Sequence, residues 1–435
     1  MNRRIALLAL LVAVVAAIWA MSATSAPTTL GPPQSDPAGL IDLPAGYTYT
    51  DLYQSCEPGT QSTEDGTVWP MPDDPDANVV FPKPGGGYWL LSNHELTDPR
   101  DPFQGDAGKC HVTERTPGDD DSDGWGSVSR ITLAQNGTTV LKKELITTGL
   151  HDLCAGAETP WKTYLTNEEF PFVVDPDKRS GWVWEIDPAT GKATRATGMG
   201  WFSHEQEARV GTAWVLTNDR GNNQYLYKFV PDRANDLTSG KLYGLVFDRT
   251  TNTGHWVGPL DPFNPEADMV AMAGPPNATN SFAKAEGMVP GPTGNSVTFS
   301  ESGVGADPGR IFVLTDVNQD EVHGYTLVEG DFARLGRPDN LRYTDAGDLF
   351  IMEDHSASDF GRGATGNVNQ VWVLPRGQQG AANLILFAQT KDEPTGPWFS
   401  SDNHLLYLSI QAELPRISHV IAIRAPQTFN QPYDR

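Results

Sequence analysis

The sequence predicts an all-β protein built as a six-bladed β-propeller. The main observation is a pattern that occurs six times, in which a short apolar run ends in acids, amides or hydroxyls. The runs lie about 50 to 80 residues apart, as expected for one structural unit repeated around a common axis. They are WLLSNHE (Trp89–Glu95), TYLTNEE (Thr163–Glu169), AWVLTND (Ala213–Asp219), VTFSES (Val297–Ser302), LFIMED (Leu349–Asp354) and LLYLSIQ (Leu405–Gln411).

Each run is expected to be the second strand of a hairpin. The runs are too short for helices and are rich in residues that suit a pleated, buried surface. Turn signals precede most of them, and a second polar cluster usually lies just upstream of the turn, so both polar ends of a hairpin meet at one rim. Six such hairpins arranged radially direct their polar ends at a central channel. The upstream clusters are CAG (Cys154–Gly156), HE (His204–Glu205), AEG (Ala285–Gly287) and RPDN (Arg337–Asn340).

Further strands are expected between these hairpins, and the 43 glycines and 34 prolines supply the many turns that an all-β chain needs. No amphipathic helix of more than about two turns is evident. Two stacked β-sandwiches are the alternative fold, but they give no reason for the recurrent polar strand ends. The additional strand candidates are residues 127–133, 143–148, 181–187, 225–230, 310–316, 371–375 and 420–425.

The first residues are predicted to be a secretion signal rather than part of the fold. Arg3 and Arg4 precede an apolar run that ends in small residues, with cleavage placed after Ala26, so the protein is expected to be exported to the periplasm or beyond the cell. An uncleaved anchor is the alternative. Residues 27–38 are interpreted as a linker, and residues 39–435 as a single propeller domain, expected to be a monomer without membrane contact once the signal is cleaved.

The chain is strongly acidic, with a formal charge of −24. Such a surface repels nucleic acid and anionic lipid, which argues against either as a partner. An anionic small molecule can approach only where something reverses the local field, and bound cations do this.

Three cysteines are an odd number for an exported chain. Cys56 and Cys110 lie in the same N-terminal, loop-like region and are candidates for a disulfide, which leaves Cys154. Cys154 begins the polar end of one hairpin, whose other end carries Glu168 and Glu169. It is interpreted either as a buried structural cysteine or as a thiolate metal ligand.

The segment CAGAETPWKTYLTNEE (Cys154–Glu169) resembles a signature of the PhoX-type alkaline phosphatase family, in which CAGG-x-TPWGTWLT-x-EE is typical. Other segments resemble the family in the same order, so that the resemblance runs from about residue 40 to about residue 412. They are NHE (Asn93–Glu95), GWVWEIDP (Gly181–Pro188), FSHE (Phe202–Glu205), LTNDRGNNQYLYKFVP (Leu216–Pro231), FAKAEGM (Phe282–Met288) and RPDNLRYTDAGDLFIMED (Arg337–Asp354).

The resemblance implies a propeller whose mouth holds Fe³⁺ and Ca²⁺ ions and which hydrolyses small-molecule phosphate esters. Carboxylates suit both of these hard cations, and a thiolate suits iron. The metal ligands that it implies, or that occupy equivalent strand ends, are Asn93, Glu95, Cys154, Glu168, Glu169, Glu205, Glu286, Glu353 and Asp354.

Two positions depart from the family pattern. Lys284 stands where an arginine is usual, two residues before Glu286, and Lys162 stands where glycine is usual. Lysine neutralises a phosphate but lacks the planar bidentate contact of a guanidinium. We interpret Lys284 as a catalytic and substrate-binding residue. Arg220, Arg337 and Arg342 are candidate phosphate contacts, with pairing to neighbouring acids as their alternative role.

A metal-dependent hydrolase of phosphate monoesters is the first functional interpretation. The alternatives are a calcium-dependent lactonase-like hydrolase and a non-catalytic propeller that binds metals or ligands. Fold alone does not separate them, because propellers host many functions. His94, His204 and His355 lack the close His–His spacing of a zinc site.

Overall fold

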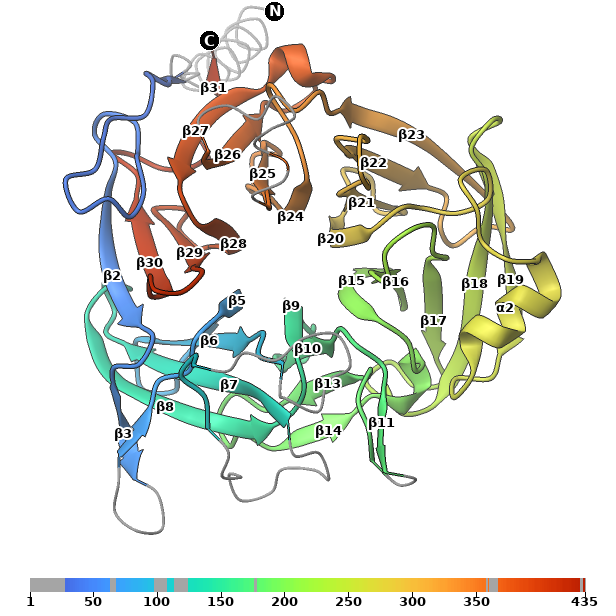
Figure 1. Cartoon of the computed structure of the whole chain (residues 1–435), viewed down its shortest axis with the longest axis horizontal. Coiled ribbons are helices and arrows are strands. Elements are labelled where there is room, and N and C mark those ends of the chain that lie inside the picture. Colours follow the sequence, from blue (N-terminus) through green and yellow to red (C-terminus); the bar gives the residue numbers. More distant parts are fainter. Residues whose placement is uncertain are drawn as a thin grey trace, which may run out of the picture.

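A computed structural model describes residues 28–62, 68–97, 108–112, 124–175, 178–356, 359, 367–430 and 433–434. In this part of the chain the β-sheets stand side by side in a ring around a central axis (Figure 1). This arrangement confirms the predicted all-β, propeller-like fold and excludes two stacked sandwiches. The predicted secretion signal, residues 1–26, lies outside the described residues.

Four of the sheets have four strands each. The first contains β5 (Pro75–Pro82), β6 (Tyr88–His94), β7 (Gly124–Leu133) and β8 (Val140–Gly149). The second contains β9 (Leu153–Glu158), β10 (Tyr164–Glu168), β13 (Val183–Ile186) and β14 (Ala193–Arg195). Another contains β24 (Pro338–Tyr343), β25 (Leu349–Glu353), β26 (Asn369–Leu374) and β27 (Ile385–Thr390). The fourth contains β28 (Glu393–Phe399), β29 (Leu405–Gln411), β30 (His419–Arg424) and β2 (Thr48–Gln54).

A nine-stranded sheet occupies the rest of the ring, because β19 pairs with β23 through Thr253–His255 and Glu321–His323. Its strand order is β15 (His204–Val210), β16 (Ala213–Asn218), β17 (Tyr227–Pro231), β18 (Gly240–Asp248), β19 (Thr253–Leu260), β23 (Glu321–Glu329), β22 (Arg310–Thr315), β21 (Ser296–Glu301) and β20 (Ala285–Pro290). The long strands β18 and β19 were not predicted, because their many exposed positions remove the apolar run that marks a buried strand.

Several short elements lie outside these main sheets. They are the pairs β1 (Thr28–Thr29) with β31 (Tyr433–Asp434), β3 (Pro58–Ser62) with β4 (Val68–Pro70) and β11 (Val173–Asp175) with β12 (Lys178–Arg179), the helix α2 (Pro265–Ala273), and the 3₁₀ turns η1 (Thr197–Met199) and η3 (Ala381–Asn383). The nine-residue α2 starts at a proline and carries two acids in its first turn, as helix N-termini favour. No helix among the described residues has the length and apolar character needed to span a bilayer.

All six of the predicted polar-ended runs form the second strand from the axis in their sheets: β6, β10, β16, β21, β25 and β29. Each pairs antiparallel with an innermost strand, as the hairpin interpretation predicted. The innermost strands contact one another in a closed cycle, β5 to β9, β15, β20, β24, β28 and back to β5. All six therefore present their starting ends to one axial site.

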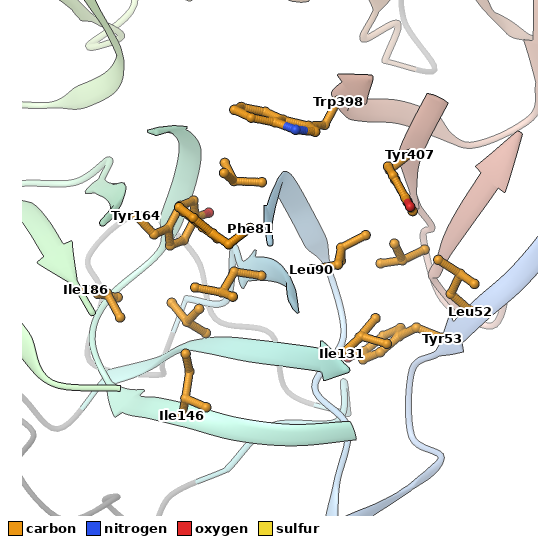
Figure 2. Packing of buried hydrophobic residues seen from close by; sticks show 14 of the residues in the cluster. Leu52, Tyr53, Phe81, Leu90, Ile131, Ile146, Tyr164, Ile186, Trp398 and Tyr407 are labelled. Atoms are coloured by element: carbon orange, nitrogen blue, oxygen red, sulfur yellow. The ribbon is translucent and has the colours of Figure 1, made fainter. Parts of the chain in front are cut away.

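Apolar side chains fill the space between neighbouring sheets, which hold together by burying these faces. One cluster draws on three sheets, with Leu52 and Tyr407 from one, Phe81 and Leu90 from the next, and Tyr164 from the third (Figure 2). The ring is closed by β2, which pairs with β30 and so joins the N-terminal segment to the last sheet. The predicted Cys56–Cys110 disulfide is formed.

Candidate metal centre

Each innermost strand carries an irregularity in its pairing close to its starting end. Bulges of this kind redirect side chains and are common beside active sites. Four of them hold an acid, namely Asp76 in β5, Glu205 in β15, Glu286 in β20 and Asp339 in β24. The other two hold Ala155 and Gly396, both with positive φ. At Gly396, with φ of 60°, a Cβ atom would lie 2.0 Å from the carbonyl oxygen of Asp76, so only glycine fits.

A second set of acids follows the second strands directly. Glu95, Glu169, Asp219 and Asp354 come after β6, β10, β16 and β25. The backbone N–H groups of Glu95, Glu169 and Asp354 donate to the carbonyl oxygens of the residues that precede the innermost strands, Asp74, Asp152 and Arg337. These three acceptors have positive φ, so the same turn geometry recurs from sheet to sheet.

The two sets converge on one axial cavity of about 90 Å³. Its lining contains nine carboxyl groups, one thiol and one ammonium group. The lining residues are Asp76, Glu95, Cys154, Glu169, Glu205, Asp219, Lys284, Glu286, Asp339, Asp354 and Glu393. Ligand atoms of Glu95, Cys154 and Glu169 lie within 4.8 Å of one another, and so do those of Glu205, Asp219 and Glu286.

Most of the carboxyl groups that line this cavity have strongly raised pKa values. Burial, reinforced by neighbouring carboxyl groups, raises the pKa of Glu95 to about 7 and that of Glu286 to about 8. The same causes raise the pKa values of Glu169, Glu205 and Glu393 well above the ordinary range. Without added cations, these groups can be buried together only by retaining protons.

Cys154 lines the same cavity. Its Sγ atom is 3.3 Å from a carboxylate oxygen of Glu169, and its side chain is 4% exposed. Burial and the surrounding acids raise the pKa of the thiol well above its ordinary value. A thiolate at this position therefore requires a cation beside it.

Lys284 supplies the positive charge of the cavity. Its Nζ atom lies 3.0 Å from Glu286 Oε1 and 3.4 Å from Asp219 Oδ2, and these carboxylates raise the lysine pKa well above its ordinary value. Its backbone has a φ of 47° and is held by hydrogen bonds to Gly221 and Ser302. One ammonium group cannot balance nine carboxyl groups.

Three of the predicted ligands lie beside this cavity but not in its lining. The carboxylate of Glu168 accepts hydrogen bonds from the backbone N–H groups of His151 and Trp182. That of Glu353 accepts from the backbone N–H of Gly336 and of Gln370 and from the Trp372 indole. The Asn93 amide joins β6 to the bulges of β5 and β9, accepting from Ala77 N–H and donating to the carbonyls of Leu153 and Ala155.

Two of the three candidate arginines, Arg220 and Arg337, also have protein partners. Arg220 pairs with Glu266 of α2 at 3.0 Å. Arg337 pairs with Asp359 at 2.9 Å and donates to the carbonyl oxygens of Ser302, Gly305 and Asp307. This is the acid-pairing role named above as their alternative. Lys162 pairs with Glu158, away from the cavity.

Four lining acids were not singled out from the sequence: Asp76, Asp219, Asp339 and Glu393. Asp219 ends the run AWVLTND, and Asp339 belongs to the upstream cluster RPDN, so the repeat itself contained the signal. Asp76 lies at the bulge of the first innermost strand, whereas Glu393 is the first residue of the last one, ahead of the bulge that holds Gly396. Applying one rule to all six units would have found the first three of these acids but not Glu393.

Comparison with known proteins adds to this geometry. The family model described as alkaline phosphatase PhoX matches residues 126–304 and 311–413. The structure titled Pseudomonas fluorescens PhoX in complex with vanadate, a transition state analogue, superimposes with a TM-score of 0.69 at 18% identity, covering 93% of this chain and 99% of that one. A gluconolactonase from Xanthomonas campestris gives a TM-score of 0.41 at 10% identity, covering 87% and 97%. No curated protein matches the sequence.

The fold and the family match together define a propeller-like phosphoric ester hydrolase of the alkaline phosphatase type. The match extends over more than half of the chain and includes Cys154 and most of the acids that line the cavity. The chain belongs to the PhoX alkaline phosphatase family.

Proposed function

We propose that this protein hydrolyses phosphate monoesters at the axial cavity, with metal cations held by Cys154 and the surrounding carboxylates. The observation that supports the proposal is the charge imbalance of the cavity, where nine carboxyl groups and a thiol face one ammonium group. Family membership favours this activity over the lactonase and binding-protein alternatives.

The donor set fits the expected Fe³⁺ and Ca²⁺ ions. Hard cations prefer anionic oxygen ligands, and a thiolate favours a transition metal over calcium. Glu95, Cys154 and Glu169 would hold iron, and Glu205, Asp219 and Glu286 would hold calcium, since each set already lies within 4.8 Å. When bound, such cations polarise a phosphoryl oxygen and lower the pKa of water.

The protein's own residues would bind and orient the ester. Lys284 is one third exposed at the side chain and can turn its ammonium group toward a phosphoryl oxygen once cations engage Glu286 and Asp219. Its contact fixes the charge of the phosphoryl group without the bidentate geometry of an arginine. The backbone hydrogen bonds that hold the left-handed turn at Lys284 keep its ammonium group at the wall of the cavity.

The proposal also covers the number of propeller blades, the export of the protein and its oligomeric state. We infer six blades, because the nine-stranded sheet contains two innermost strands, β15 and β20, and divides naturally where β19 meets β23. We also propose export through residues 1–26, with function as a monomer.

The test combines activity with metal content. Cys154→Ala and Glu286→Gln are expected to lower kcat/KM for an aryl phosphate by at least about 100-fold, because a lost ligand releases or misplaces a cation. Circular dichroism should show the fold retained, and elemental mass spectrometry should show reduced iron in the first variant and reduced calcium in the second. The exposed Glu321→Gln is the matched control. Unchanged turnover in both variants would refute the proposed site.

A further inference from the structure

The central channel holds a second cavity on the side away from the metal centre. It has a volume of about 340 Å³ and lies among the later residues of β9, β15, β20, β24 and β28. The strand β15 serves both cavities, since Glu205 lines the metal centre while Glu207 and Arg209 line the second cavity.

A layer of amides separates the two cavities. The Gln206 side chain donates to the carbonyl of Gly156 and accepts from the backbone N–H of Met288. The Asn340 amide oxygen accepts from the backbone N–H of Gly396. The cavity at this level has a volume of only about 10 Å³, which is about enough for one water molecule.

Glu207 is buried in this compartment without a partner. Its side chain is 2% exposed, and neither carboxylate oxygen accepts a hydrogen bond among the described residues. The Asn167 amide, which donates to the carbonyl of Glu205, lies close enough to offset part of the effect of burial on the Glu207 pKa, but not at hydrogen-bond distance from its oxygens. A buried, unsatisfied carboxyl group is costly, so a hydrogen-bond donor is expected to complete it.

Two guanidinium groups line the same space without a hydrogen-bonded anion. Arg342 stacks on the Trp398 ring, 3.7 Å from its centre, at the edge of the apolar cluster of Figure 2. The described residues include no hydrogen-bond or ion-pair partner within bonding distance of it, and burial lowers its pKa to about 10, which leaves it charged at neutral pH. The Nε atom of Arg209 is likewise buried without a partner.

The other acids of this compartment already have partners. Glu158 pairs with Lys162 at 2.8 Å, and Asp345 accepts a hydrogen bond from Asn403 at 2.7 Å. They contribute attraction to Arg342 at longer range only. The charged lining groups that still lack hydrogen-bond partners among the described residues are therefore the guanidinium groups of Arg342 and Arg209, which donate, and the carboxylate of Glu207, which accepts.

We propose that the second cavity is a binding site for a protonated oxyanion, namely phosphate or the phosphoryl group of a small ester that retains an O–H. The anionic oxygens accept from Arg342 and Arg209, and the phosphate O–H donates to Glu207. Burial raises the pKa of Glu207 to about 7, so well above pH 7 the group is a carboxylate that can only accept hydrogen bonds. Sulfate has the same shape as phosphate but no proton to donate, so Glu207 should reject sulfate at pH 8.5. The site is distinct from the metal centre and does not depend on the proposed hydrolysis.

Crystals of the metal-loaded protein soaked with arsenate or selenate would locate the ion by anomalous scattering. Arsenate, which keeps a proton at neutral pH, is expected beside Arg342 and Glu207 as well as at the metal centre, whereas selenate should be missing from the second cavity. Arsenate confined to the metal centre, or only water in the second cavity, would overturn the proposal.

Calorimetry of the metal-loaded protein with inorganic phosphate tests the residues. Arg342→Gln should weaken the second binding event at least tenfold while Glu286→Gln alters the first, and Arg424→Gln, an exposed arginine of β30, should change neither. Glu207→Gln should admit sulfate, because an amide can donate where a carboxylate cannot. Elemental analysis must show unchanged metal content in the Arg342, Glu207 and Arg424 variants. Sulfate binding equal to phosphate in the unsubstituted protein would contradict the role of Glu207.

Discussion

At the scale of a single residue, Lys284 cannot pair with its carboxylate partners and bind a substrate at the same time. In the absence of cations its ammonium group is held by Glu286 and Asp219, which also belong to one candidate ligand set. Cations and this ammonium group therefore compete for the same carboxylates. The lysine becomes available to a substrate only after cations have taken its partners.

Removing the Lys284 charge is expected to weaken substrate binding. Lys284→Ala should raise KM for an aryl phosphate about tenfold, equivalent to about 1.4 kcal/mol, because the ester loses a charged hydrogen bond. Lys284→Arg should restore KM, since a guanidinium reaches the same oxygens. Steady-state kinetics on the three proteins measure this, and an unchanged KM in the alanine variant would place Lys284 outside substrate binding.

At the scale of elements, the alternation of side chains along each strand decides which polar residues line the axial cavity. Glu169 and Asp354 line the cavity, while their neighbours Glu168 and Glu353 are occupied by backbone N–H groups. Successive residues of a strand face opposite sides, and a bulge reverses the order locally. The sequence could thus predict where each hairpin ends, but not which of two adjacent acids faces the axis.

Asn93 also shows a limit of prediction from the sequence, because a residue predicted to be a ligand has a structural role. As a polar residue at a strand end it was a candidate ligand, yet its amide makes three hydrogen bonds to the backbone of β5 and β9. Two of these contacts are to β9 in the neighbouring sheet, which no local pattern reveals. The strands themselves were predictable because each contains its own apolar run, whereas the side-chain partners come from distant segments.

Asn93→Ala is expected to lower the free energy of unfolding by about 2–4 kcal/mol, because three buried backbone groups lose their partners. It should also lower iron retention, since the bulge beside Cys154 is no longer held. Urea denaturation provides the measurement. Asn235→Ala, an exposed change of the same type, is the control, and equal stability of both variants would contradict the positioning role.

At the scale of the whole molecule, the buried acids make stability depend on pH and on cations together. Their pKa values are raised in the folded protein, so the metal-free folded state holds protons that the unfolded chain has already lost. The free energy of unfolding must then fall as pH rises from the ordinary carboxyl value of 4.5 to about 8 for Glu286. Bound cations remove this dependence by replacing the protons.

Protein stripped of metals with a chelator is therefore expected to have a higher Tm at pH 5 than at pH 8. Dialysis against calcium and ferric salts should raise Tm most at pH 8, where the carboxylates are ionised. Scanning calorimetry at both pH values, with and without metals, tests this. A metal-free protein that is more stable at pH 8 would show that the acids do not share one buried site.

The closed ring also determines when the axial site can assemble during synthesis of the chain. Asp76 of the first sheet accepts a hydrogen bond from Thr395, which is 319 residues later in the chain, and Glu393 enters the cavity from the same strand. At ordinary ribosomal speeds of 5–20 residues per second, roughly 15–60 s separate the synthesis of these partners. The early acids must remain solvated during this interval, so the centre can assemble only when the last hairpin has emerged.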